Sequence, residues 1–296
     1  MSRPLVYSAI PTAFSPTGAV DLAATTRVFT HALAGGVDAL FVNGTTAEFP
    51  SLTLTERGDI LTAAVDAAGA DRVVAHVGAP SPYQTRLLTR DALALGVTKL
   101  SVLTPFYMPS TLDGVREQIA AVTSLAESRD VFLYLFPDRT GVEIRPEEAA
   151  ALIEEFDLAG AKISIAGVEY LQGVVDALHT ERMVLSGNDG LLREVVAAGG
   201  AGVVSGVSSS VPGPFTALAD AVGRGDAAAQ EAAAAAVAAV VPVLGPSIAA
   251  LKESLVLQGL IGGASCRMAI DAVDQAYRVR IAEALAAVSG TVAPAV

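Results

Sequence analysis

The chain has 296 residues, of which 52% are hydrophobic and 17% charged, and this balance excludes a mainly disordered protein. Asp and Glu number 31 against 19 Lys and Arg, for a formal net charge of −12, and no basic cluster is present. This charge argues against binding to nucleic acid or to an anionic membrane surface. The single cysteine, Cys266, excludes an intrachain disulfide and a CxxC metal site, and we interpret it as structural.

The sequence also bears on cellular location. Its first residues lack the long apolar core of a signal peptide. The most apolar run, from Ala232 to Val241, is mostly alanine and is shorter than the roughly 20 residues that span a bilayer. We therefore expect a cytoplasmic protein without a membrane segment.

Eight short apolar runs alternate with longer helical patterns along the first 225 residues. Near-continuous apolar runs are typical of parallel strands that are covered on both faces. The predicted strands are Ser8–Phe14, Ala39–Val42, Val73–Val77, Lys99–Leu103, Val131–Phe136, Leu158–Ile163, Met183–Ser186 and Gly202–Val207. The predicted helices are Leu22–Ala34, Leu54–Ala68, Pro82–Leu95, Leu112–Ser128, Pro146–Glu155, Val168–Leu178, Gly190–Ala198 and Pro212–Val222, with Asp21 as the cap of the first.

This alternation predicts an α/β protein of the (β/α)8 barrel type in residues 1–225, and a doubly wound open sheet is the alternative. Residues 226–296 carry no strand signal. We expect them to form a C-terminal subdomain of about three helices, with breaks near Pro242–Gly245 and Gly262–Gly263. The alanine-rich stretch Ala227–Ala239 is predicted to be a well-packed helix, because alanine is the best helix former.

Lys162 stands inside the apolar strand Leu158–Ile163, and it is one of only three lysines in the chain. A buried lysine is costly unless it is paired, reaches a cavity or gives up its proton. One interpretation is a snorkelling or salt-bridged lysine. The other is a nucleophile that forms a Schiff base, since burial favours the neutral amine that attacks a carbonyl.

Other candidates lie near the carboxyl ends of predicted strands, where barrel enzymes place their chemistry. Gly44–Glu48 is a hydroxyl-rich turn that can bind a carboxylate or can be an ordinary loop. Tyr134 and Tyr107 are general acid/base candidates or packing residues. Arg139 can pair with a neighbouring carboxylate or bind an anionic substrate.

The three histidines do not point to a metal. His31 and His179 fall in helical patterns and are predicted to lie at the surface. His76, at the end of the third predicted strand, can face the barrel, and we interpret it as a core histidine. No group of His, Asp and Glu has metal-ligand spacing, so we expect no metal and no other bound cofactor.

Together these segments resemble one family. Gly44-Thr-Thr-Ala-Glu48 is similar to a GTTGE motif, Tyr134-x-x-Pro-x-Arg-Thr-Gly141 to YNxPxRTG, Gly160-Ala-Lys162 to an active-site G-[IV]-K, and Ser186-Gly-Asn-Asp189 to SGDD. Gly202–Ser205 with Pro212, Leu251-Lys-Glu253 and Gly259–Gly262 resemble its strand 8 and C-terminal helices. On these motifs the chain is identified as a member of the dihydrodipicolinate synthase/N-acetylneuraminate lyase family of Schiff-base pyruvate aldolases and lyases.

The resemblance implies a TIM barrel with a C-terminal helical subdomain, assembled as a homotetramer built from dimers. It implies that Lys162 forms a Schiff base with pyruvate or another 2-keto acid. The substrate would then be the only group bound covalently to the protein, and no cofactor would be needed. It also implies a proton shuttle at Tyr134, in a relay that Thr45 and a Tyr107 from the partner subunit complete. Thr45 and Thr46 would bind the keto-acid carboxylate, and Gly187 and Val204 would line the pocket. Arg139 would contact a carboxylate of the second substrate or orient Tyr134.

The expected function is condensation of pyruvate with an aldehyde, or cleavage of the adduct, with a 4-hydroxy-tetrahydrodipicolinate-synthase-like reaction first. A 2-keto-3-deoxy sugar-acid aldolase or dehydratase of the same family is the alternative. A non-catalytic 2-keto-acid binding protein on this scaffold and a metal-dependent barrel enzyme are the further readings. The chain departs from the motifs of the family at six positions, which are Ala47, Phe106, Leu135, Ile163, Ser164 and Asn188. These departures argue against the synthase assignment, but the motif lysine, Lys162, is present.

Overall fold

The computed structural model describes residues 2–127, 129–245 and 247–289. Its eight strands follow one another around a closed parallel barrel, which confirms the predicted barrel over the open sheet. The strands are β1 (Leu5–Ala9), β2 (Ala39–Val42), β3 (Val73–His76), β4 (Lys99–Leu103), β5 (Asp130–Leu135), β6 (Gly160–Ile163), β7 (Met183–Ser186) and β8 (Gly202–Ser205).

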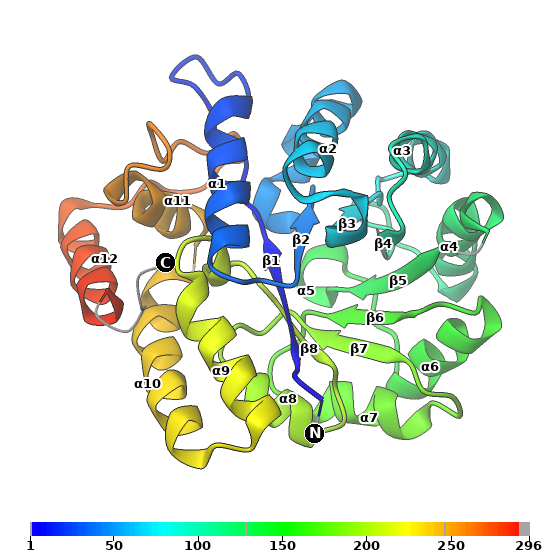
Figure 1. Cartoon of the computed structure of the whole chain (residues 1–296). Coiled ribbons are helices and arrows are strands. Elements are labelled where there is room, and N and C mark those ends of the chain that lie inside the picture. Colours follow the sequence, from blue (N-terminus) through cyan, green and yellow to red (C-terminus); the bar gives the residue numbers. More distant parts are fainter. Residues whose placement is uncertain (1, 128, 246, 290–296) are drawn as a thin grey trace. The chain divides into compact units, whose positions relative to one another are not determined.

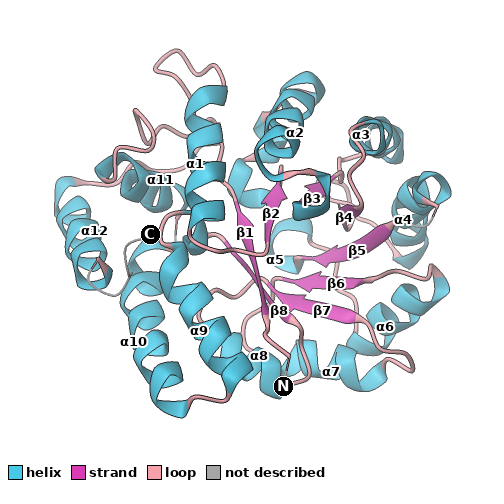
Figure 2. Ribbon diagram, in the orientation of Figure 1, coloured by secondary structure: helices cyan, strands magenta, loops and turns pink. Residues whose placement is uncertain are grey.

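Helices connect the strands and follow the last of them (Figures 1 and 2). Within residues 2–225 they are α1 (Leu22–Ala34), α2 (Leu54–Ala68), α3 (Pro82–Ala94), α4 (Leu112–Ala126), α5 (Pro137–Thr140), α6 (Pro146–Glu155), α7 (Glu169–Ala177), α8 (Leu192–Ala197) and α9 (Pro212–Arg224). Beyond them come α10 (Ala227–Leu244), α11 (Ile248–Leu257) and α12 (Gln275–Val288). The end of one predicted helix, Ser128, lies outside the described residues.

The first strand was predicted in the wrong place. The sequence suggests Ser8–Phe14, whereas β1 runs from Leu5 to Ala9. The apolar run covers both segments, but Pro11 cannot donate a hydrogen bond to a neighbouring strand. Phe14 instead forms an isolated antiparallel bridge with Val20. The cap of α1 is confirmed, because the Asp21 carboxylate accepts a hydrogen bond from the Ala24 amide at 2.9 Å.

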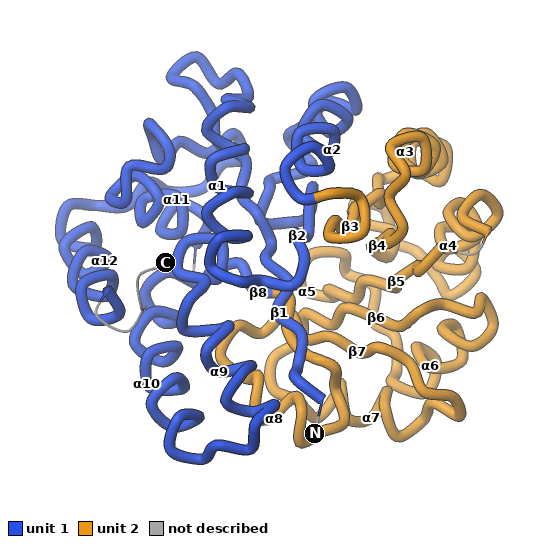
Figure 3. Tube along the Cα trace, viewed as in Figure 1, with its two compact units in different colours: residues 1–68, 205–296 blue, residues 69–204 orange. Residues whose placement is uncertain are grey.

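The described chain divides into two compact units (Figure 3). Unit 1 comprises residues 1–68 and 205–296, and unit 2 comprises residues 69–204. Within unit 2, parallel pairing joins each strand from β3 to the next in order. Within unit 1, α9, α10, α11 and α12 pack on one another. The boundary expected between a barrel and a helical subdomain at residues 225 and 226 stays a prediction.

Helix α10 is longer and more exposed than predicted. It is 18 residues long and continues past Ala239 and through Pro242, and its end at Leu244 lies within the break predicted near Pro242–Gly245. Among the described residues, α10 is the one helix whose length and composition would suffice to cross a membrane. Although one side of it packs on α9, α11 and α12, only Val237, Val240 and Leu244 are buried, so α10 is a largely exposed helix. Alanine favours the helix through its backbone, without a side chain large enough to require burial.

Candidate active site

Lys162 lies on β6, a strand with a hydrogen-bonded neighbour on each side. It is paired in register with Tyr134 of β5 and with Leu185 of β7. Because paired residues of a sheet direct their side chains to the same face, Lys162 and Tyr134 lie side by side. The Lys162 Nζ is 4.1 Å from the centroid of the Tyr134 ring. Lys162 is only 5% exposed and Tyr134 only 1%, so the amine and the phenol meet in a buried setting.

Aromatic rings enclose the Tyr134 side chain. The His76 ring meets it edge-on, with ring centroids 5.9 Å apart, and the Phe136 ring stacks on it at 6.1 Å. His76 is buried, as predicted for a core histidine. Its contact with the Tyr134 ring was not predicted. The sequence feature that could have indicated this contact is the position of His76 at the end of β3.

Gly187 leaves space beside the Lys162 side chain. A Cβ atom at this position would lie 3.4 Å from the Lys162 Cε and 2.1 Å from the Ser164 hydroxyl. The Gly187 amide donates to the Ile163 carbonyl at 2.7 Å, which fixes the chain after β7 against β6. Any larger residue here would displace Ser164. Val204, the other predicted lining residue, is buried on β8.

The short helix α5 carries Arg139 just after β5. Arg139 is exposed, and its guanidinium carbon lies 5.5 Å from the Phe136 ring centroid. In the described part of the chain it makes no ion pair, so the expected pairing with a neighbouring carboxylate is not observed. Behind it, the Thr104 hydroxyl donates to the Thr140 hydroxyl at 3.2 Å and so ties the end of β4 to α5.

A cavity of about 600 Å³ opens beside α5. Its lining includes Leu135, Pro137, Glu143 and Tyr170. The Tyr170 hydroxyl donates to the Ile144 carbonyl at 2.6 Å, and burial raises the pKa of this phenol. Tyr170 is therefore a fixed wall of the cavity rather than a proton donor.

Tyr107 follows β4 and stands apart from the buried pair. It is 90% exposed, and its φ of 75° is in the left-handed region that side chains seldom adopt. The adjacent Met108 is also exposed. Within one chain, Tyr107 is therefore a surface residue, whereas Tyr134 is a buried one.

In unit 1, Thr45 and Thr46 form a 3-10 turn with Ala47 after the carboxyl end of β2. Both threonines are half-buried, and the Glu48 amide closes the turn by donating to the Thr45 carbonyl at 2.9 Å. Ala47, which departs from the family motif, is buried, and within the segment Gly44–Glu48 the residue with a positive φ is Glu48, at 57°. The Ala47 carbonyl accepts a hydrogen bond from the Thr12 hydroxyl at 2.9 Å.

The histidines and other metal-ligand residues are dispersed in the structure. Among residues 2–127, 129–245 and 247–289, no three His, Cys, Asp or Glu side chains gather as a metal site. His179 is exposed after the end of α7 and pairs with Glu154 at 3.0 Å. His31 is half-buried rather than at the surface, and its Nε2 lies 2.8 Å from the Ser210 carbonyl oxygen.

Comparison with known proteins identifies the family to which this chain belongs. The model of the dihydrodipicolinate synthetase family matches residues 4–288. An uncharacterized DapA-like lyase of Halobacterium salinarum is 36% identical over 263 residues, which are 87% of this chain and 85% of that protein. A 4-hydroxy-tetrahydrodipicolinate synthase of Parasynechococcus marenigrum is 34% identical over 225 residues, which are 75% and 74% of the two chains.

A solved structure agrees with this assignment. The dihydrodipicolinate synthase of Thermotoga maritima superimposes with a TM-score of 0.89 at 26% identity, over 99% of this chain and 100% of that one. The protein is thus a lyase built on a (β/α)8 barrel. It belongs to the dihydrodipicolinate synthetase family.

Proposed function

We propose that this lyase joins pyruvate, or a related 2-keto acid, to an aldehyde through a Schiff base on Lys162, or cleaves the corresponding adduct. The observation that carries the proposal is the buried amine of Lys162 at 4.1 Å from the Tyr134 ring centroid on the neighbouring strand. An amine held away from water beside a phenol is a suitable nucleophile with a proton carrier at hand.

The proposed chemistry needs only these groups and the substrates. The neutral Lys162 amine attacks C2 of the keto acid and gives a carbinolamine, which loses water to form the iminium ion. The iminium withdraws electrons, so C3 loses a proton and becomes a nucleophilic enamine. The enamine carbon attacks the aldehyde carbon, and the new alkoxide takes up a proton. Water then releases the product and restores Lys162. In this scheme the Tyr134 hydroxyl carries protons at the carbinolamine and carbon–carbon steps.

The resemblance supplies the remaining roles. Thr45 and Thr46 bind the keto-acid carboxylate through hydroxyl and backbone N–H groups, and Thr45 joins the proton relay with Tyr134. Tyr107 completes the relay from a second copy, in a dimer that forms half of a homotetramer, and its 90% exposure in the single chain is consistent with such a contact. Arg139 receives a carboxylate of the second substrate, and Gly187 and Val204 line the pocket. No metal or other cofactor takes part, and the protein acts in the cytoplasm.

The proposed second substrate is a carboxylate-bearing aldehyde, in a 4-hydroxy-tetrahydrodipicolinate-synthase-like reaction. The exposed guanidinium of Arg139, without an ion-pair partner in the described chain, supports this assignment. Family members named 4-hydroxy-tetrahydrodipicolinate synthase at 34% identity are consistent with it.

A second candidate is the cleavage or dehydration of a 2-keto-3-deoxy sugar acid. It is favoured by Ser164, whose hydroxyl lies beside Gly187 close to the lysine, where it can contact a hydroxylated substrate. Leu135, which lines the cavity beside α5, stands in the place of a motif asparagine and so departs from the synthase pattern.

The test is reductive trapping. Incubation with pyruvate and borohydride should add one carboxyethyl group to the protein, and peptide mapping should place it on Lys162. The Lys162→Met variant is the matched control and should not be modified. Attachment to Lys99 or Lys252, or no attachment with a panel of 2-keto acids, would overturn the proposal. Trapping without turnover of any aldehyde or sugar acid would instead indicate a binding protein.

A further inference from the structure

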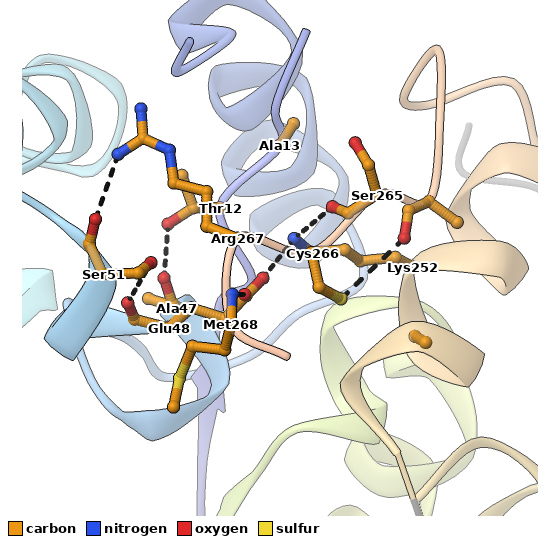
Figure 4. A network of polar contacts seen from close by, with 12 residues as sticks. Thr12, Ala13, Ala47, Glu48, Ser51, Lys252, Ser265, Cys266, Arg267 and Met268 are labelled. Carbon is orange, nitrogen blue, oxygen red and sulfur yellow. Dashed lines mark hydrogen bonds and ion pairs between the residues drawn. The ribbon is translucent and has the colours of Figure 1, made fainter. Parts of the chain in front are cut away.

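Glu48 and Lys252 form an ion pair inside unit 1. Lys252 comes from α11, and Glu48 directly follows the turn Thr45–Ala47, so 204 residues separate the two in sequence. The Lys252 Nζ lies 2.5 Å from the Glu48 Oε1, and both side chains have 0% exposure. Figure 4 shows the lysine side chain extending from α11 to the carboxylate. The pair therefore joins the hydroxyl-rich turn to the C-terminal part of the chain.

Further polar contacts complete the surroundings of both charges. The Lys252 ammonium also donates to the Ser265 carbonyl at 2.9 Å, and it sits 4.3 Å from the centroid of the Phe14 ring. The second Glu48 oxygen accepts from the Met268 amide at 2.8 Å. A buried ion pair is tolerated when additional hydrogen bonds satisfy its remaining atoms, as they do here. Lys252 is thus engaged on several sides, unlike a nucleophile that faces a substrate.

A second ion pair attaches the segment of residues 264–268, which contains Ser265 and Met268, to residues of the N-terminal part of unit 1. The Arg267 guanidinium pairs with Glu56 at 2.6 Å and donates to the Ser51 and Gly18 carbonyls. The segment is therefore attached by Met268 to Glu48 and by Arg267 to Ser51 (Figure 4). Arg267 attaches it to Glu56 as well. These contacts attach the segment both to Glu48, which follows the turn Thr45–Ala47, and to Glu56 in the first turn of α2.

The Glu48 backbone transmits this anchoring to the turn. Its φ of 57° is in the left-handed region, which a residue with a side chain keeps only when its surroundings hold it there. Its amide donates to the Thr45 carbonyl at 2.9 Å, and its carbonyl accepts from the Ser51 hydroxyl at 2.8 Å. Moving the Glu48 side chain would therefore release the hydrogen bond that closes the turn.

We propose that Glu48 and Lys252 are positioning residues: their buried ion pair holds the turn Thr45–Ala47 in the form that binds the 2-keto-acid carboxylate. This inference rests on the proposed function, in which Thr45 and Thr46 bind that group. The pair touches no substrate and acts only through the backbone of the turn. Its loss should therefore weaken keto-acid binding much more than it slows the chemical steps at Lys162.

The experiment compares three proteins with the wild type. Lys252→Met removes one charge, and the double variant Glu48→Gln/Lys252→Met removes both. Arg278→Met is the matched control, because it breaks another ion pair of α11, that of Arg278 with Glu253 at 3.0 Å. Circular dichroism verifies folding. If the single variant does not fold, the double variant decides, because it leaves no unpaired buried charge.

The first readout is borohydride trapping on Lys162 as a function of pyruvate concentration. We expect the half-saturating concentration to rise about 10- to 100-fold in the Lys252 variants, since a small misplacement of a binding group has effects of that order. The trapped fraction at saturation and the Arg278→Met curve should match the wild type. An unchanged half-saturation in a folded variant overturns the positioning role and leaves the proposed function intact. Absence of trapping in the wild type overturns the proposed function, and the positioning role with it.

The second readout does not depend on substrate. Hydrogen exchange of peptides covering residues 44–52 should be faster in both Lys252 variants than in the wild type and in Arg278→Met. Equal protection in all four proteins would show that the turn holds its form without the ion pair, and would overturn the inference even if keto-acid binding had changed.

Discussion

The Lys162 amine lies over the face of the Tyr134 ring, 4.1 Å from its centroid, on two strands that pair in register. This contact is made with the ring itself and does not involve the phenol hydroxyl. The ring and the hydroxyl can therefore be tested separately, because Phe keeps the first and removes the second.

Tyr134→Phe should damage turnover much more than folding. The ring contacts to Lys162, His76 and Phe136 persist, and a lost hydroxyl hydrogen bond costs about 1 kcal/mol. Loss of a proton shuttle lowers the rate by roughly 10²- to 10⁴-fold. Thermal melting and steady-state turnover measure the two effects. Tyr170→Phe, which also removes a buried hydroxyl bond, is the control and should retain turnover. Nearly full activity in Tyr134→Phe would make Tyr134 a packing residue.

Acid should weaken unit 1 through Glu56. The Arg267 hydrogen bond, with help from Thr53, lowers the pKa of Glu56 from 4.5 to about 2. The stabilisation from this depressed pKa is fully present above pH 4.5 and is lost as pH falls toward 2. Urea unfolding of the wild type and of Glu56→Gln should therefore differ most near neutral pH, and the two curves should converge in acid. A difference that stays constant down to pH 2 would contradict this assignment.

Cys266 should react slowly in the folded protein. Burial raises the pKa of its thiol to about 11, although Lys252 acts in the opposite direction. At pH 8 a free thiol is about one-quarter thiolate, whereas this thiol would be about 0.1%, so alkylation should be on the order of 10²-fold slower than for a free cysteine. Labelling with iodoacetamide before and after unfolding in urea measures the ratio. Equal rates in the two states would show that the thiol is accessible and ionised.

Gly160→Ala should prevent stable folding. Gly160 has a φ of 156°, and a Cβ atom there would lie 1.9 Å from the Met183 carbonyl oxygen of β7. Rigid backbone cannot yield to this clash, so we expect a loss of more than about 4 kcal/mol in the free energy of unfolding. Gly58→Ala is the matched control. It lies in α2 with nothing near its Cβ position, and alanine should stabilise the helix there by about 0.5–1 kcal/mol. Denaturant unfolding compares both, and a soluble, native-like Gly160→Ala protein would refute the expectation.

The sequence was a sufficient guide where the signal was local. The strands β2, β4 and β7 have the predicted bounds. Lys162 lies on a buried strand, as its apolar surroundings in the sequence indicate, and its catalytic role stays a prediction. The placement of β1 failed because apolarity is shared by the strand and by the buried residues after it, and only Pro11 marks the difference.

Contacts between residues far apart in the sequence could not be predicted from local patterns. Nothing near Glu48 in the sequence indicates that its partner is Lys252, since the chain reaches that contact only after the barrel strands are complete. His76 was correctly predicted as buried, but its contact with Tyr134 depends on the order of β3, β4 and β5 in the barrel. The exposure of α10 was missed because alanine content predicts a helix and is silent about packing.

The place of Lys162 on a strand with two paired neighbours also determines which parts of unit 2 can adapt. Releasing the β6 backbone means separating it from β5 and from β7, an opening whose free energy approaches that of unfolding the whole sheet. The anchor of the amine is thus among the slowest parts of the chain to move. Accommodation of substrates of different size must then come from the connections beyond the strand ends, such as residues 104–111 and 137–141. If the enzyme acts on aldehydes as proposed, changes in the range that it accepts should be obtained by altering these loops, with β6 left as it is.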